Sequence, residues 1–154
     1  MAKQKSNTQP VWRFLFLVYM GLMLWLLFGR SRGWGQDATY LQILAGNINL
    51  RPFYTIRNYM NIVLHYPNSS IFPHCVINLV GNVVMFVPAG WLLPRIFKAM
   101  RKFPAFLLTS LCGILFVEAL QLLTLLGSFD VDDIILNLIG MVIGFIIWKC
   151  HNKR

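Results

Sequence analysis

The chain has 154 residues, of which 57% are hydrophobic and only 12% charged, and its mean hydropathy is +0.61. This composition excludes an ordinary soluble domain and predicts a small integral membrane protein with a single domain, residues 1–154. A net charge of +9 would suggest nucleic acid in a soluble protein, but here it indicates basic segments flanking membrane helices, so no nucleic acid partner is expected.

Four apolar segments predict membrane-spanning helices, at about residues 11–29, 75–93, 104–126 and 133–148. We expect the first to be an uncleaved helix, because Gly29, Arg30, Ser31 and Arg32 follow it in place of a small-residue cleavage site. The apolar part of the last, residues 134–148, is too short to cross a bilayer of ordinary thickness. It must therefore begin within the preceding acidic turn or lie where the bilayer is thin. The expected fold is an all-α bundle of four transmembrane helices.

The second and fourth segments carry residues with specific structural expectations. In the second, Pro88 predicts a kink, Gly90 lies close by, and Pro94 is expected to end the helix. In the fourth, Gly140 and Gly144 form a GxxxG step that lets another helix approach closely. We therefore expect the fourth helix to pack inward through this face.

Basic residues predict the orientation of the chain. They precede the first span, separate the second from the third, and follow the fourth: Lys3, Lys5, Arg13, Arg95, Lys98, Arg101, Lys102, Lys149, Lys153 and Arg154. With four spans these segments share one side, which the positive-inside rule assigns to the cytoplasm. Both termini are then cytoplasmic, and the acidic turn and the long loop of residues 30–74 lie outside.

This outer loop is too long to be an idle connection, so it is expected to be structured. Pro52 fixes its own backbone and disfavours a helical Arg51, which predicts a rigid, extended turn that includes Phe53. Residues 56–66 have helical periodicity, with one apolar and one polar face. They form either an amphipathic helix at the membrane surface or an ordinary surface helix packed on the bundle.

Four of the five acidic residues lie close together near the C-terminus: Glu118, Asp130, Asp132 and Asp133. Glu118 has apolar sequence on both sides, and a carboxylate facing lipid would be costly, so it must face protein or a wet cavity. Glu118 is then protonated, hydrogen-bonded to amides such as Asn82 or Asn137, or paired with Arg51 or Arg57 from the outer loop.

Polar side chains of three helices are expected at the same outer level of the membrane. They are Asn78 and Asn82, Glu118 and Gln121, and Asp133 and Asn137. Because each pair is three or four residues apart, its members share a helical face. Amides in membrane helices often only join helices, and Asp130 or Asp132 is equally well explained as a helix cap. His65 and His74 lie on the same side, but no spacing supports a metal site, and neither metal nor cofactor is expected.

Several motifs together resemble VanZ-like membrane proteins. They are Asn49-Leu50-x-Pro52-Phe53, then Asn82-x-x-x-Phe86-x-Pro88-x-Gly90-x-x-Leu93, then Glu118-x-x-Gln121, then Gly127-x-x-Asp130-x-x-Asp133-x-x-x-Asn137-x-x-Gly140-x-x-x-Gly144. They follow the family order, whereas Arg51 falls at a variable position, and Asn78 and Asp132 are not carried over. The resemblance implies a multi-pass protein of the bacterial cytoplasmic membrane. The namesake of the family is associated with low-level resistance to the lipoglycopeptide teicoplanin.

Two functions are compatible with these residues. In the favoured, non-enzymatic one, an outer polar pocket binds an envelope lipid head group, a cell-wall precursor or the lipoglycopeptide. Its expected ligand-binding residues are Arg51, Asn82, Glu118, Gln121, Asp130, Asp133 and Asn137, with Pro52, Phe53, Pro88, Gly90, Gly140 and Gly144 in structural roles. In the alternative, Glu118 and Asp133 form the acid–base pair of an intramembrane enzyme that modifies an envelope lipid or lipid-linked substrate. Proton-coupled transport is weaker, because nothing ionisable lines the inner half.

Overall fold

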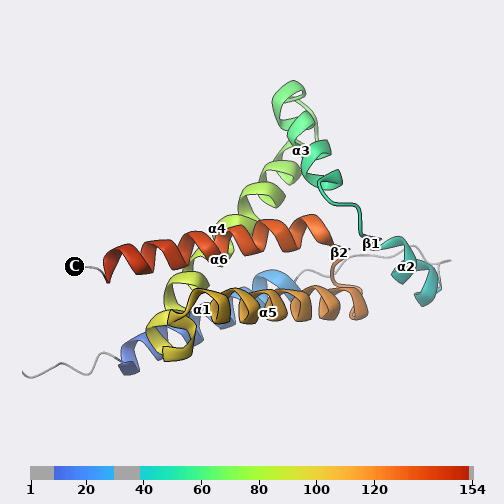
Figure 1. Cartoon of the computed structure of the whole chain (residues 1–154). Helices are drawn as coiled ribbons and strands as arrows, with labels where there is room; N and C mark the ends of the chain where they lie inside the picture. Colours follow the sequence, from blue (N-terminus) through green and yellow to red (C-terminus); the bar gives the residue numbers. More distant parts are fainter. Residues whose placement is uncertain (1–8, 30–38, 153–154) are drawn as a thin grey trace, which may run out of the picture.

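The computed structural model describes residues 9–29 and 39–152. Its helices are α1 (Gln9–Phe28), α2 (Tyr40–Gly46), α3 (Tyr54–His65), α4 (Phe72–Ile96), the short 3-10 helix η1 (Lys98–Arg101), α5 (Phe103–Leu123) and α6 (Val131–His151) (Figure 1). The basic residues Lys3, Lys5, Arg30, Arg32, Lys153 and Arg154 lie outside the described residues.

Four of these helices, α1, α4, α5 and α6, are long and apolar enough to cross a membrane, which confirms the predicted all-α membrane fold. α6 begins at Val131, inside the acidic turn, and reaches 21 residues, so a thin bilayer is not required. α5 ends at Leu123, a little earlier than predicted. Figure 1 places the start of α1 and the end of α6 at one end of the bundle, here called the terminal end. The opposite end, which carries α2 and β2, is called the loop end; which end faces the cytoplasm stays a prediction.

The prediction that Pro94 ends the second span is wrong, because α4 continues to Ile96 with both Pro88 and Pro94 inside it. A proline removes its own backbone donor but leaves the carbonyls around it free to accept. The amide of Phe97 still donates to the carbonyl of Leu93 at 2.8 Å, and the Arg101 Nε donates to the Pro94 carbonyl at 3.1 Å. The last turn of α4 is therefore closed without the proline amide.

α4 and α6 form the centre of the bundle and approach each other through glycines. A Cβ at Gly140 would overlap the Val83 carbonyl, and a Cβ at Gly144 would overlap the Val87 carbonyl. From the other side, a Cβ at Gly90 would overlap the Met141 carbonyl. The close helix contact expected of the GxxxG step is confirmed, and Gly90 contributes to it from α4.

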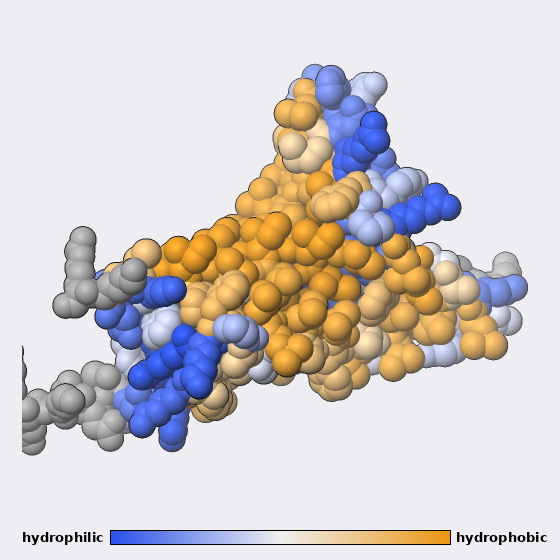
Figure 2. Space-filling model, in the orientation of Figure 1, coloured by the Kyte–Doolittle hydropathy of each residue, from blue (hydrophilic) through white to orange (hydrophobic). Residues whose placement is uncertain are grey.

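α1 is the least buried of the four long helices, with Met23 its one buried residue. Near the terminal end it is held to α4 by Arg95, whose guanidinium lies 4.5 Å from the ring centroid of Trp12 and 4.0 Å from that of Trp91. Closer to the loop end, the Tyr19 hydroxyl donates to the Met85 carbonyl at 2.8 Å. Figure 2 shows a broad hydrophobic surface over these helices, with hydrophilic residues gathered toward both ends.

The predicted outer loop is structured, as expected. Besides α2 and α3, it contains β1 (Ile48–Asn49), which pairs in parallel with β2 (Phe129–Asp130) in the acidic turn. These short strands were not predicted, because two-residue strands have no periodicity to detect. α3 packs on α4, and Figure 1 shows α3 and the first turns of α4 projecting from the other helices.

Candidate functional site

A cavity of about 190 Å³ lies at the loop end, where residues of all four long helices meet. We call it the polar cavity. Its lining includes Leu26 and Leu27 of α1, His74, Asn78, Asn82 and Met85 of α4, Glu118 and Gln121 of α5, and Asp133 and Asn137 of α6, together with Gly127 and Ser128 of the turn. The structure thus brings together the six polar side chains that the sequence placed at one level.

Glu118 is the most enclosed carboxyl group of this cavity, with only 3% of its surface exposed. Its Oε1 accepts a long hydrogen bond of 3.4 Å from the Asn137 side-chain amide, whereas its Oε2 has no hydrogen-bond partner. Of the three environments that the sequence left open, the structure therefore shows contact with an amide. The amide is that of Asn137, and Asn82 bonds elsewhere.

Three residues that line the polar cavity each have a buried side-chain oxygen without a hydrogen-bond partner. They are Glu118 through Oε2, Asn78 through Oδ1 and Asn137 through Oδ1. A buried acceptor without a partner costs roughly 1–3 kcal/mol. Three such atoms around one cavity favour a group that brings hydrogen-bond donors.

Hydrogen bonds between helices fix the walls of the polar cavity. The Asn82 side-chain amide donates to Asp133 Oδ1 at 2.6 Å and so joins α4 to α6. The Gln121 amide donates to the Leu27 carbonyl at 3.1 Å and joins α5 to the last turn of α1, where helix carbonyls lack partners of their own. These two side chains therefore hold the helices together as well as lining the cavity.

Asp130 and Asp132 lie beside the polar cavity and hold the outer loop in place. Asp130 caps α6, its Oδ1 accepting from the Asp132 amide at 2.8 Å, while its Oδ2 accepts from Thr55 at 2.6 Å and from Asn49 at 3.2 Å. The capping interpretation of Asp130 is thus the one that its contacts support.

Asp132 has no exposed surface, and its importance was missed by sequence reasoning. Its carboxylate accepts from the amide of Phe53 at 2.5 Å and from that of Ile56 at 3.0 Å, at the start of α3. Phe53 has a φ of 63°, a left-handed conformation that is costly for a residue with a side chain. In the sequence, Asp132 is recognisable only as an acid next to a helix cap. That position does not reveal that its hydrogen-bond donors lie in another segment, at the start of α3.

Arg51 does not reach the polar cavity. Its side chain is exposed and lines a separate surface hollow of about 440 Å³, together with Asn49, Tyr54 and Asp130. The suggested pairing of Arg51 with Glu118 is not formed. Among the described residues, no group of three or more His, Cys, Asp or Glu side chains is arranged to hold a metal ion.

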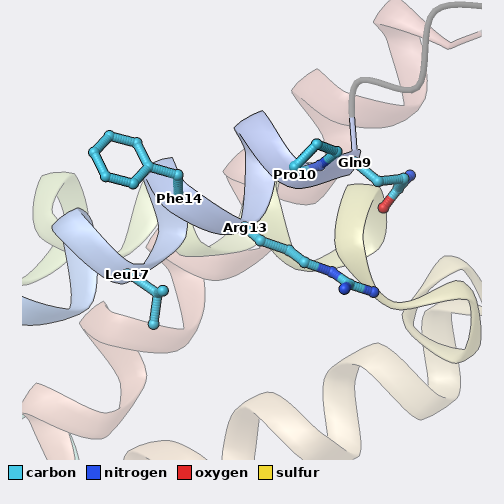
Figure 3. A pocket seen from close by; sticks show the side chains of 5 residues that line it. All are labelled: Gln9, Pro10, Arg13, Phe14 and Leu17. Carbon is cyan, nitrogen blue, oxygen red and sulfur yellow. The ribbon is translucent and has the colours of Figure 1, made fainter.

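A wider surface hollow, of about 630 Å³, lies at the terminal end of α1 (Figure 3). It is lined by Gln9, Pro10, Arg13, Phe14 and Leu17, all from this one helix. Because it has no carboxyl group and no second wall of side chains, it is a weaker candidate site than the smaller polar cavity.

Comparisons with known proteins point in one direction. A family model described as VanZ/LLP1 matches residues 16–152. The protein named Protein VanZ from Enterococcus faecium is 26% identical over 130 residues, which cover 82% of this chain and 79% of that protein. No solved structure matches.

Proposed function

Because this chain belongs to the VanZ/LLP1 family, we propose that it modulates susceptibility to glycopeptide and lipoglycopeptide antibiotics such as teicoplanin. It does so by binding a ligand in the polar cavity. The observation that carries this proposal is the set of three unpartnered oxygen acceptors, on Asn78, Glu118 and Asn137, around one cavity.

The ligand has to donate hydrogen bonds. An envelope lipid head group, a cell-wall precursor and the lipoglycopeptide itself all carry N–H or O–H groups that meet this need. Glu118 receives the principal donor, Asn137 orients Glu118, and Asn82 orients Asp133. Gln121 keeps α1 and α5 together at the mouth of the site.

The predicted orientation agrees with this function. The positive-inside rule places the loop end outside the cytoplasm, and the polar cavity lies at that end. Glycopeptides act on cell-wall precursors on the same side of the membrane. A binding site at the loop end is therefore accessible to these ligands.

The test is teicoplanin susceptibility of cells that express the Glu118→Gln variant. The substitution preserves shape but removes the charge and replaces an acceptor oxygen by a donor, so we expect tolerance to fall to that of cells without the protein. Asn61→Asp, on the exposed face of α3, is the control and is expected to retain full tolerance. Full tolerance of Glu118→Gln at normal membrane abundance would contradict the proposal.

A second candidate is an intramembrane enzyme, because two carboxyl groups, Glu118 and Asp133, line the same cavity. Glu118 is buried and Asp133 is only partly buried, so one acts as proton donor and the other as proton acceptor toward an envelope lipid or lipid-linked substrate. Mass spectrometry of envelope lipids and precursors, with and without the protein, distinguishes the two. A new or missing species supports the enzyme, and unchanged pools rule it out.

A further inference from the structure

An apolar cavity of about 180 Å³ lies next to the polar cavity, between α1, α4, α5 and α6. We call it the apolar cavity. Its walls include Met20 and Met23 of α1, Phe86 of α4 and Gly113 and Ile114 of α5. Nothing in the proposed binding of a polar head group explains this second cavity.

The two cavities follow one another along every long helix. Leu27 of α1 lines both. On α4, Met85 lines the polar cavity and Phe86 lines the apolar cavity. On α5, Glu118 lines the polar cavity and Val117 lines the apolar cavity. On α6, Asn137 lines the polar cavity and Met141, one helical turn closer to the terminal end, lines the apolar cavity.

A polar cavity followed by an apolar cavity along the bundle fits an amphiphilic ligand. A polar group is held at the loop end, and a hydrocarbon chain extends from it toward the middle of the bundle. Each cavity is below the roughly 300–1,000 Å³ of a typical ligand site, whereas the two together fall within that range.

The position of α1 gives a hydrocarbon chain a route from the bilayer. α1 packs chiefly on α4, and of its residues only Met23 is buried, so the seam between α1 and α5 is loosely closed. The link from α5 to α1 provided by Gln121 lies at the loop end, above the apolar cavity. Between the helices below this link, a chain can enter sideways without unfolding any element.

The charge of the polar cavity indicates the kind of head group. Its lining contains the acids Glu118 and Asp133 but neither lysine nor arginine. A primary ammonium group carries three N–H donors and no acceptor, which matches the three unpartnered oxygens in number, and its positive charge is complementary to the two acids. His74 and Ser128, more exposed than Glu118, stand at the mouth and can donate to a phosphate attached to the same head group.

We propose that the protein binds a membrane lipid whose primary ammonium head group occupies the polar cavity and one of whose acyl chains occupies the apolar cavity. The inference rests on the proposed function for the head-group part alone. The acyl-chain part stands on the shape and the lining of the apolar cavity.

The first experiment uses the unaltered full chain in vesicles that contain phosphatidylethanolamine with a photoreactive group in one acyl chain. After irradiation, peptide mass spectrometry locates the attachment. We expect it at Met23 or Ile114, which line the apolar cavity and are buried. Attachment confined to bilayer-facing residues such as Leu108 and Phe116 would overturn the proposal.

The second experiment fills the apolar cavity. Ser110 is 4% exposed with an unpartnered hydroxyl, and a Cβ at Gly113 would meet open space, so Ser110→Leu and Gly113→Phe both occupy room that the chain needs. Because the filled cavity no longer admits the chain, we expect these variants to lose most of the phosphatidylethanolamine that the unaltered protein retains in native mass spectrometry. Leu108→Phe, on the outward face of α5, is the control and retains the lipid.

Glu118→Gln in the same assay tests the head-group site separately from the acyl-chain site. If it loses the lipid while Ser110→Leu and Gly113→Phe both keep it, the head-group site stands and the acyl-chain inference fails. If the cavity-filling variants lose the lipid while Glu118→Gln keeps it, the acyl chain is bound as proposed and the head-group assignment fails. Loss in both sets supports the whole proposal.

Discussion

At the scale of single residues, Asp132 is the group on which the outer loop depends most directly. It is fully buried and accepts two backbone hydrogen bonds from the start of α3, one of them from the left-handed residue Phe53. A carboxylate at a helix N-terminus also interacts favourably with the helix dipole. One side chain of α6 thereby fixes where α3 begins.

Replacing Asp132 by alanine should detach the start of α3. Two partly buried backbone amides, those of Phe53 and Ile56, lose their acceptor, at a cost of up to about 1–3 kcal/mol each. We expect a lower midpoint of thermal unfolding in detergent and rapid amide hydrogen exchange in the first turn of α3. Asp132→Asn keeps one acceptor oxygen and should fall between the alanine variant and the unaltered protein. Unchanged exchange at Phe53 and Ile56 in the alanine variant would show that other contacts hold the helix.

The sequence predicts well which polar residues share a level, because helical spacing and depth in the membrane are local properties. Asn82, Glu118 and Asn137 were placed together in this way, and the structure brings them to one cavity. The partners of Asp132 and Arg51 could not be predicted, since they depend on how the outer loop folds back on the acidic turn. Which lining residues bind a ligand stays a prediction.

At the scale of secondary structure, the packing of α4 on α6 decides the shape of both cavities. The two helices approach closely enough that a Cβ at Gly90, Gly140 or Gly144 would overlap the backbone of the partner helix. Backbone cannot move aside as a flexible side chain can. The distance between these helices is therefore set by the absence of side chains at these positions.

Gly140→Ala should push α4 and α6 apart near the polar cavity. Overpacking of this kind costs about 1–3 kcal/mol, so we expect a lower thermal unfolding midpoint in detergent. Gly21→Ala is the matched control, because a Cβ there meets nothing within 4 Å, and its midpoint should be unchanged or higher. Equal midpoints for the two variants would contradict the close contact.

α1 is held to α4 by another contact, that of the Arg95 guanidinium with the rings of Trp12 and Trp91, which lie edge to face with centroids 5.3 Å apart. Arg95→Lys keeps the charge but loses the broad guanidinium that contacts both rings. A cation–π contact contributes about 0.5–2 kcal/mol, so we expect α1 to become more sensitive to proteases in detergent while α4 stays protected. An unchanged cleavage pattern would mean that Tyr19 and the apolar contacts suffice to hold α1.

The boundaries of the elements show where sequence patterns stop being informative. The acidic turn supplies the first turn of α6, because Asp130 caps the helix there. The sequence allowed this start or, as the alternative, a shorter helix in a thin part of the bilayer. α4 passes through Pro94 to Ile96, and its last turn is closed by the Phe97 amide and the Arg101 side chain. The pairing of β1 with β2 joins residues far apart in the chain and has no local signature.

At the scale of the whole molecule, a hydrophobic middle separates two polar ends of different character. The terminal end carries basic residues, among them Lys98, Arg101, Lys102 and Lys149, whereas the loop end carries the buried acids. Figure 2 shows hydrophilic residues at both ends and along the projecting α3. The positive-inside rule uses this difference in basic residues, and it predicts that the terminal end faces the cytoplasm.

The predicted orientation can be tested with cysteine labelling in cells. Cys150 is exposed near the end of α6, Cys75 is buried, and Asn68 is exposed between α3 and α4. With a membrane-impermeant maleimide, we expect Cys150 to be labelled only after permeabilisation. A variant that combines Cys150→Ser with Asn68→Cys should be labelled in intact cells, because the predicted topology places Asn68 outside the cytoplasm. Cys150→Ser alone is the control for labelling at Cys75 and Cys112. The reverse pattern would place the polar cavity on the cytoplasmic side, where it could not meet a glycopeptide.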